Sequence, residues 1–188
     1  PSEPATRTSA PPVLETRWDI VALAIIAGVV CAVQVGKVPP ALPVLRAELG
    51  IGFITAGWVA SLVNICGGVL GVASGLIIDR VGPRRVTVIS LLIMAGGGAI
   101  GAEANSALML LASRFLEGLG LVGAVVAAPA IIRIACQPAD RNLALGLWGT
   151  YLPAGMAIAL LAAPGLMEEF GWRGFWWCNV ALVIGFAG

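Results

Sequence analysis

Long uncharged runs are the feature that most limits what this chain can fold into. Thirty consecutive residues, Leu49 to Ile78, carry no charge. After a short charged segment, another seventeen uncharged residues follow, from Val86 to Ala102. Roughly 20 apolar residues in a helix are needed to cross the hydrocarbon core of a bilayer. The composition agrees, because 59% hydrophobic and only 11% charged residues leave too little polar surface for a water-soluble domain. The sequence therefore predicts an integral membrane protein.

The charged residues divide the chain into six apolar blocks. A backbone in the bilayer core must satisfy its own hydrogen bonds, so each block predicts a helix. The expected spans cover residues 18–48, 53–78, 86–102, 107–135 and 142–167, and a truncated sixth span follows Phe175. The predicted fold class is an all-α integral membrane bundle of six transmembrane helices over residues 18–188. Residues 1–17, rich in Pro, Ser, Thr and Ala, predict a disordered cytoplasmic tail.

The distribution of basic residues predicts the orientation of the spans. Cytoplasmic loops of membrane proteins carry an excess of Lys and Arg. With the N-terminus in the cytoplasm, seven arginines lie inside, and only Arg46 and Arg173 lie outside. We therefore expect a multi-pass protein of the cell (inner or plasma) membrane with a cytoplasmic N-terminus.

Several function classes are disfavoured by residues that the chain lacks. It contains no histidine, which removes Ser–His and Cys–His catalysis and histidine metal sites. Its four cysteines are scattered, and no Walker-type phosphate loop is present. A net charge of +1 gives no electrostatic case for nucleic acid. We expect neither an enzyme nor a bound cofactor or metal, and no nucleic-acid partner.

Glycines recur at intervals of four in two of the expected spans. One stripe is Gly67, Gly71 and Gly75, and the other is Gly97 and Gly101. Small residues at this spacing let helices approach closely in a membrane. We therefore expect both stripes to lie in tight helix contacts.

The charged segment between the second and third spans, GLIIDRVGPRR, has a distinctive pattern. Glycine permits a turn that a bulkier residue would resist, and the arginines anchor the loop at the inner membrane surface. A plain positive-inside loop would carry the same arginines. The full pattern resembles the signature that the major facilitator superfamily carries at this place, with Pro83 where many members have a basic residue. Its matching positions are Gly75, Asp79, Arg80, Gly82, Arg84 and Arg85.

Three further stretches are similar to motifs of the same superfamily. They are Arg114-x-x-x-Gly118-x-Gly120, Pro138-x-x-Arg141-x-x-Ala144-x-Gly146, and Gly171-Trp172-Arg173 followed by Phe175. The resemblance implies a fold of twelve helices in two six-helix halves, with the substrate path between them. This chain would be the N-terminal half, and the C-terminal six-helix half would be its partner. The Gly75–Arg85 motif would then act as a conformational gate.

Three ionisable residues lie at membrane depth: Lys37, Arg114 and Glu117. Such residues cost about 2.5–3.5 kcal/mol each on insertion scales, and they mark functional sites by default. Arg114 and Glu117 are three positions apart on one helix face and are expected to pair. The pair is interpreted either as a proton-coupling site, with Glu117 carrying the proton and Arg114 as its switchable partner, or as an ion pair that only holds the bundle together.

Lys37 lies on the first span, three residues after Gln34 and just before two prolines that interrupt the helix. Broken helices at membrane depth are tolerated where they line protein or a cavity. Gln34 falls where many sugar and drug porters of the superfamily carry an acid. Lys37 and Arg114 against Glu117 leave the expected cavity positive by one charge, which favours an anionic substrate; Lys37 reaching to the membrane interface is the alternative. Asn64 and Tyr151 are further candidates for substrate contacts.

The function predicted is secondary active transport of a small solute by alternating access, coupled to protons. Substrate-binding candidates are Lys37, Arg114, Gln34, Asn64 and Tyr151. One alternative is a drug/proton antiporter, although residues 162–167 lack the glycines of the motif that those members carry in the fifth span. The other alternative is a transport-dead membrane scaffold of the same fold.

Overall fold

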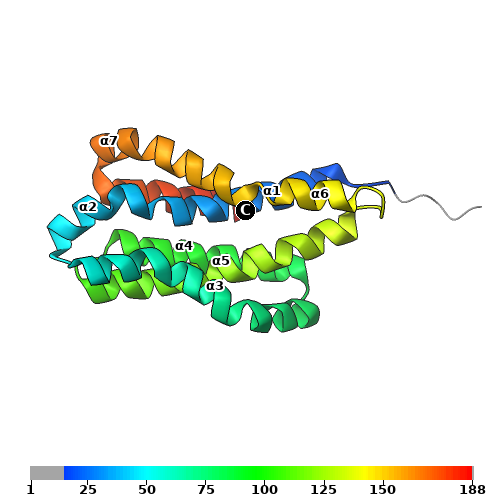
Figure 1. Ribbon diagram of the computed structural model, residues 1–188, viewed down its shortest axis with the longest axis horizontal. Helices are drawn as coiled ribbons and strands as arrows, with labels where there is room; N and C mark the ends of the chain where they lie inside the picture. The colour runs from blue at the N-terminus through cyan, green and yellow to red at the C-terminus, as the bar shows by residue number, and fades with distance from the viewer. Residues whose placement is uncertain (1–14, 188) are drawn as a thin grey trace, which may run out of the picture.

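The computed structural model describes residues 15–187, and all its regular secondary structure is helical (Figure 1). The elements are α1 (Trp18–Gly36), α2 (Val38–Leu49), α3 (Phe53–Val81), α4 (Pro83–Ala102), α5 (Ala107–Ala135), α6 (Arg141–Trp148) and α7 (Tyr151–Ala187). The long helices run side by side along the molecule. The prediction of an all-α fold is therefore confirmed. Most of the predicted tail, residues 1–17, lies outside the described residues.

Five stretches of the described chain are long and apolar enough to cross a membrane. They are Trp18–Leu49, Phe53–Val81, Pro83–Ala102, Ala107–Ala135 and Arg141–Ala187. The last stretch covers 47 residues, far more than one span needs. It is interrupted at Gly171, where the backbone adopts φ 66° and ψ 178°, a conformation open essentially to glycine alone. The chain doubles back at this point, from the orange to the red part of α7 (Figure 1). The count of six spans stays a prediction.

Lys37 separates α1 from α2 within the first apolar stretch. The first turn of α2 contains Pro39 and Pro40, which have no backbone N–H to continue the hydrogen-bond ladder of α1. Proline is tolerated in a first turn because the amide hydrogens there have no helical partner. The break consequently lies inside the bundle, between two helices of one apolar stretch.

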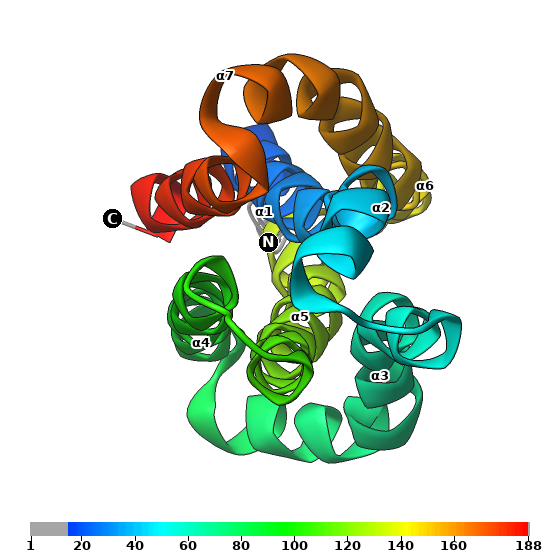
Figure 2. The ribbon, with the colours of Figure 1, turned by 90° about the vertical axis from the view of Figure 1, so that its left-hand side faces the viewer.

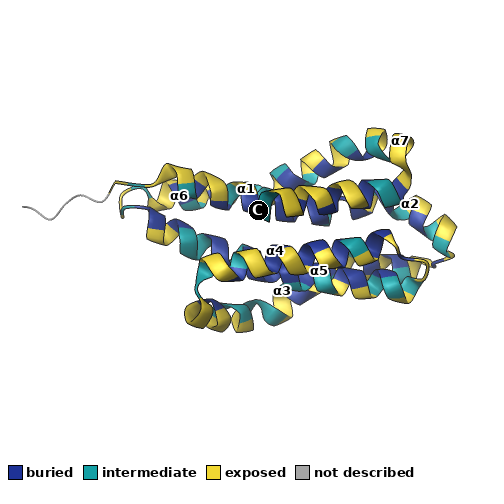
Figure 3. Ribbon diagram, turned by 180° about the vertical axis from the view of Figure 1, so that it is seen from behind, coloured by how far each residue is buried: buried dark blue, intermediate teal, exposed yellow. Residues whose placement is uncertain are grey.

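Helices α1 and α5 occupy the middle of the bundle, and α3 and α7 lie at its sides (Figure 2). Helix α5 packs on α3, α4 and α1, while α1 also packs on α7. The outer surfaces of the helices are largely apolar and exposed (Figure 3). Helix α3 is the least buried of the apolar stretches. Most of the buried polar residues in the described chain lie on α1 and α5 or at the end of α1, and Ser90 of α4 and Asn179 of α7 are buried as well.

Close helix contacts depend on glycine at several crossings. A Cβ atom on Gly120 of α5 would lie 2.4 Å from the carbonyl oxygen of Ser90 on α4. A Cβ atom on Gly97 of α4 would lie 2.9 Å from α5, and one on Gly101 would lie 2.8 Å from both α5 and α7, in agreement with the prediction for that stripe. Around Gly71 and Gly75 of α3, in contrast, nothing lies within 4 Å. A Cβ atom on Gly67 would lie 4.0 Å from the Val122 side chain of α5, which is an ordinary contact. The tight packing predicted for the α3 stripe is therefore absent from the described bundle, because the face at Gly71 and Gly75 meets no other helix.

The segment before α1 is fastened to the connection between α5 and α6. The Arg17 N–H donates to the Ala135 carbonyl at 2.9 Å, and the Thr16 hydroxyl donates to the Asp140 carboxylate at 2.5 Å. The Gln137 side-chain amide donates to the same Asp140 oxygen at 2.9 Å. These hydrogen bonds, that from Thr16 first, hold the pKa of Asp140 below its ordinary value. The start of the first span and the end of α5 are thus tied at one end of the bundle.

Tryptophans fasten the opposite end. The Trp172 indole N–H donates to Glu48 at 2.7 Å, and the Trp177 indole N–H donates to Glu103 at 3.0 Å. The Arg173 guanidinium donates to the Ala102 carbonyl at 2.9 Å. The residues directly after the break at Gly171 therefore hold the ends of α2 and α4 in place.

Gly120→Ala tests the close crossing of α4 and α5. The added methyl group meets backbone that cannot rotate away, so we expect a loss of about 1–3 kcal/mol in the free energy of unfolding. Thermal unfolding of the protein in detergent measures the loss. Gly96→Ala is the matched control, because Gly96 of α4 has nothing within 4 Å of its Cβ position. Equal effects of the two substitutions would contradict the packing argument.

Candidate functional site: a buried charge cluster in the bundle

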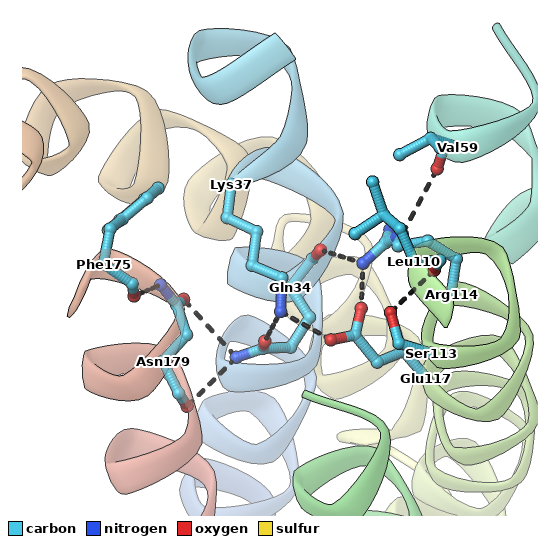
Figure 4. A network of polar contacts seen from close by, with 9 residues as sticks. All are labelled: Gln34, Lys37, Val59, Leu110, Ser113, Arg114, Glu117, Phe175 and Asn179. Carbon is cyan, nitrogen blue, oxygen red and sulfur yellow. Dashed lines mark hydrogen bonds and ion pairs between the residues drawn. The ribbon is translucent and has the colours of Figure 1, made fainter. Parts of the chain in front are cut away.

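The three ionisable residues at membrane depth meet at one place (Figure 4). The side chains of Lys37 and Arg114 are 0% exposed and that of Glu117 is 1% exposed. Lys37 reaches the site from the break between α1 and α2, and the other two project from one face of α5. Lys37 does not reach to the surface, so the alternative that it extends to the membrane interface does not describe this conformation.

Glu117 accepts from both cations. The Lys37 Nζ lies 2.6 Å from the Glu117 Oε1, and the Arg114 Nη1 pairs with the Glu117 Oε2. Lys37 also donates to the Gln34 Oε1 at 2.9 Å and lies 4.7 Å from the centroid of the Trp176 ring. Each oxygen of the one carboxylate thus holds a different cation.

Arg114 also joins α5 to two neighbouring helices. Its Nε donates to the Val59 carbonyl of α3 at 3.2 Å, and its Nη1 donates to the Gln34 carbonyl of α1 at 3.3 Å. Its Nη2 is buried and has no hydrogen-bond partner among the described residues. An unmatched buried donor costs free energy, so this nitrogen is an unused point of contact in the cluster.

Two residues of α7, Asn179 and Trp176, lie beside the cluster, and they were not predicted from the sequence. Asn179 accepts a hydrogen bond from Gln34 through its backbone oxygen at 3.3 Å, and Trp176 covers Lys37. The signal that could have found Asn179 is that of a polar residue within an apolar run, because such residues in membrane helices face the interior of the bundle.

The formal charges of the cluster do not balance. With Lys37 and Arg114 both protonated, two cations and one carboxylate leave one excess positive charge among side chains that are fully buried. Burying a charge without a partner costs several kcal/mol. The cluster is closed to solutes in this conformation, since none of its three charged side chains is more than 1% exposed. Any direct contact with a solute requires the surrounding helices to move.

The other predicted site residues lie apart from the cluster. Asn64 is exposed on α3, and Tyr151 stacks on Trp148 with ring centroids 4.3 Å apart. The predicted gate residues lie at the connection of α3 and α4, where Gly82 has φ 91°, which favours glycine. Within residues 15–187, the charged side chains of this segment are exposed and form no ion pair; they are Asp79, Arg80, Arg84 and Arg85. In the same residues, no group of three or more cysteine, aspartate or glutamate side chains is placed to hold a metal ion.

Comparison with known proteins identifies the family. The family model described as Major Facilitator Superfamily matches residues 23–187. The chain belongs to the Major Facilitator Superfamily. The resemblance noted in the sequence is thereby confirmed, and the chain is related to membrane transporters rather than to enzymes.

Individual proteins similar in sequence to this chain support the same family. An uncharacterized MFS-type transporter of Mycobacterium tuberculosis is 32% identical over 76% of this chain and 25% of its own length. The puromycin resistance protein of Streptomyces alboniger is 30% identical over 73% of this chain and 27% of its own length. The chain thus matches only about a quarter of the length of these relatives.

A solved structure shares the fold. A bacterial homologue of the human lysosomal transporter Spinster, in an inward-facing and unoccupied conformation, matches 95% of this chain and 42% of that chain. The TM-score is 0.76 at 17% sequence identity. At this identity the likeness establishes the superfamily fold alone.

Lys37→Met and Glu117→Gln test the charge imbalance. Glu117→Gln leaves two buried cations without a counter-charge, and we expect it to lower the free energy of unfolding by about 3–5 kcal/mol. Lys37→Met leaves the Arg114–Glu117 pair with no net charge, so its cost is smaller. Thermal unfolding in detergent measures both. A greater loss for Lys37→Met than for Glu117→Gln would contradict the excess of positive charge.

Proposed function

We propose that this chain is the N-terminal six-helix half of a secondary active transporter that moves a small solute by alternating access. The membership of the superfamily and the match of 95% of this chain to 42% of a solved chain of the same fold support this proposal. The break at Gly171 supports a sixth span, because it divides α7 into two helices. The single observation that carries the transport proposal is the buried cluster of Lys37, Arg114 and Glu117.

Glu117 is the proposed proton-coupling residue. It is the one carboxylate in a cluster with two cations, so its protonation would leave both Lys37 and Arg114 without a counter-charge. Because both charges are buried, that change is costly in the closed cluster and favours an opened one. Protonation of the Glu117 carboxylate is thereby linked to the packing of α1 against α5.

Glu117→Gln tests the coupling in the full-length transporter reconstituted in vesicles. We expect the substitution to abolish uptake driven by a proton gradient and to leave the exchange of solute across the membrane largely intact, since exchange needs no net proton movement. Retained exchange also shows that the variant is folded. Glu169→Gln, at an exposed position of α7, is the control. Normal accumulation by Glu117→Gln would refute the assignment.

An anionic solute is the substrate class that the charge balance favours. The excess positive charge and the unpartnered Nη2 of Arg114 offer a cation and a free donor to a carboxylate or a small inorganic anion. Lys37 and Gln34 would contribute once the cluster opens. Asn64 and Tyr151 lie away from it and are proposed as polar contacts along the path to the partner half.

Uptake of organic and inorganic anions, compared with sugars and cations, tests the substrate class. We expect transport of an anion that falls by more than about tenfold in Lys37→Ala and in Arg114→Ala, the loss expected when about 1.4 kcal/mol or more of binding is removed. Arg133→Ala, an exposed arginine of α5, should leave uptake unchanged. Uptake confined to neutral or cationic solutes would overturn the anion proposal.

The gate and the orientation are further parts of the proposal. The α3–α4 connection, with Arg80, Arg84 and Arg85, would face the cytoplasm of the cell membrane, as would the N-terminus. The uncovered face of α3 at Gly75 and Asp79 would contact the C-terminal half of the transporter. Opening and closing of that contact would gate the solute path.

Drug export is the second candidate function. The similarity to a puromycin resistance protein favours it. Drug export and anion uptake differ in direction and in substrate charge. Drug accumulation in cells that do or do not express the full-length transporter therefore separates the two candidates.

A further inference from the structure

A chain of hydrogen bonds leads from α7 through α1 to the charge cluster (Figure 4). The Asn179 Nδ2 donates to the Phe175 carbonyl at 2.7 Å. The Gln34 Nε2 donates to the backbone oxygen of Asn179 at 3.3 Å and lies 3.5 Å from its Oδ1. The Lys37 Nζ donates to the Gln34 Oε1 at 2.9 Å and to Glu117 at 2.6 Å.

The direction of each bond in the chain follows from chemistry. A lysine ammonium only donates, so Gln34 must turn its carbonyl oxygen toward Lys37 and its NH₂ group toward α7. The Asn179 NH₂ group donates to the Phe175 carbonyl, and this orientation leaves the two oxygens of Asn179 on the side of Gln34. Reversing either amide would place two donors or two acceptors against each other in a buried site.

We propose that Asn179 is a positioning residue for proton coupling: through Gln34 it holds an acceptor on Lys37 and so fixes how Lys37 pairs with Glu117. This inference rests on the proposed role of Glu117. The link between Gln34 and Asn179 is the longest in the chain, and it joins two different helices. Movement of α7 against α1 would break it first, free the Gln34 amide to turn, and leave the Lys37 ammonium without the acceptor that fixes its position against Glu117.

The protonation of Glu117 depends on the groups that the neighbouring helices place around it. Lys37 and Arg114 are the charged ones. Helix α3 contributes the Val59 carbonyl and the Cys66 thiol near Arg114, α4 contributes Gly98, and α7 contributes Asn179 and Trp176. Among the groups contributed by α3, α4 and α7, only the Cys66 thiol is titratable, and it lies near Arg114 rather than near Lys37. The chain from Asn179 therefore acts on the Lys37 side of the carboxylate.

Asn179→Leu in the full-length transporter tests the proposal. The substitution removes the Oδ1 partner of Gln34 and leaves only the backbone oxygen of residue 179. We expect proton-driven uptake to persist, with the midpoint of its pH profile moved upward by up to about one unit, because the Gln34 carbonyl is then held less firmly toward Lys37 and Lys37 pairs less well with Glu117. If this variant does not fold, Asn179→Ser replaces it. A serine hydroxyl retains the bond to the carbonyl four residues earlier and is too short to reach Gln34.

Two controls separate positioning from structure. Ser113→Ala removes a buried hydroxyl beside the cluster that bonds only to Leu110, and it should leave the pH midpoint unchanged. In a Gln34→Leu background, Asn179→Leu should add no further shift, since it acts through Gln34. An unchanged midpoint in Asn179→Leu, an equal shift in Ser113→Ala, or a full additional shift in the Gln34→Leu background would each overturn the proposal. Failure of the proposed role of Glu117 is a different result, because the Glu117→Gln variant would then show normal proton-driven uptake.

Discussion

The carboxylate of Glu117 is the group on which the interior of this bundle depends. Two buried cations, Lys37 and Arg114, share its two oxygens. A buried ion pair contributes little net stability, but removing one partner from it is costly. The helices that carry these residues are therefore held in one arrangement: the break between α1 and α2 must face α5, and α5 must turn its Arg114–Glu117 face inward. Glycines at the crossing of α4 and α5 allow the two backbones to approach closely, and this brings α4 against the helix that carries Arg114 and Glu117.

The two ends of the bundle are fastened by the same kind of contact. At one end, Thr16 and Gln137 share the Asp140 carboxylate. At the other end, indole N–H groups of Trp172 and Trp177 occupy Glu48 and Glu103. In both cases a carboxylate at a helix end is bound by neutral donors rather than by cations. Among residues 15–187, the buried ion pairs thus lie at the centre of the bundle, where the proposed coupling takes place, and the Arg17–Asp19 pair at one end is exposed.

Much of the fold could be predicted from the sequence, because uncharged runs of spanning length and helix-breaking prolines are local signals. The Arg114–Glu117 pair was predictable for the same reason, since three positions on a helix define one face. The Lys37–Glu117 contact joins residues 80 positions apart, and only the packing of α1 on α5 decides it. The glycine stripes show the same limit. Gly71 and Gly75 have the spacing of Gly97 and Gly101, yet only the second pair meets a helix, because spacing describes a surface and not its neighbour.

The separation of Lys37 from Glu117 along the chain also bears on how the protein is made. Membrane helices are inserted in order as the ribosome synthesises them, so Lys37 enters the bilayer with the first span, before Glu117 exists. A lysine at the centre of a lone helix costs about 2.5–3.5 kcal/mol on insertion scales. The prolines directly after Lys37 weaken the helix at the same point. Lys37 is therefore the residue of the first span that is least favourable to hold in lipid alone, and it gains its counter-charge only when α5 arrives beside it.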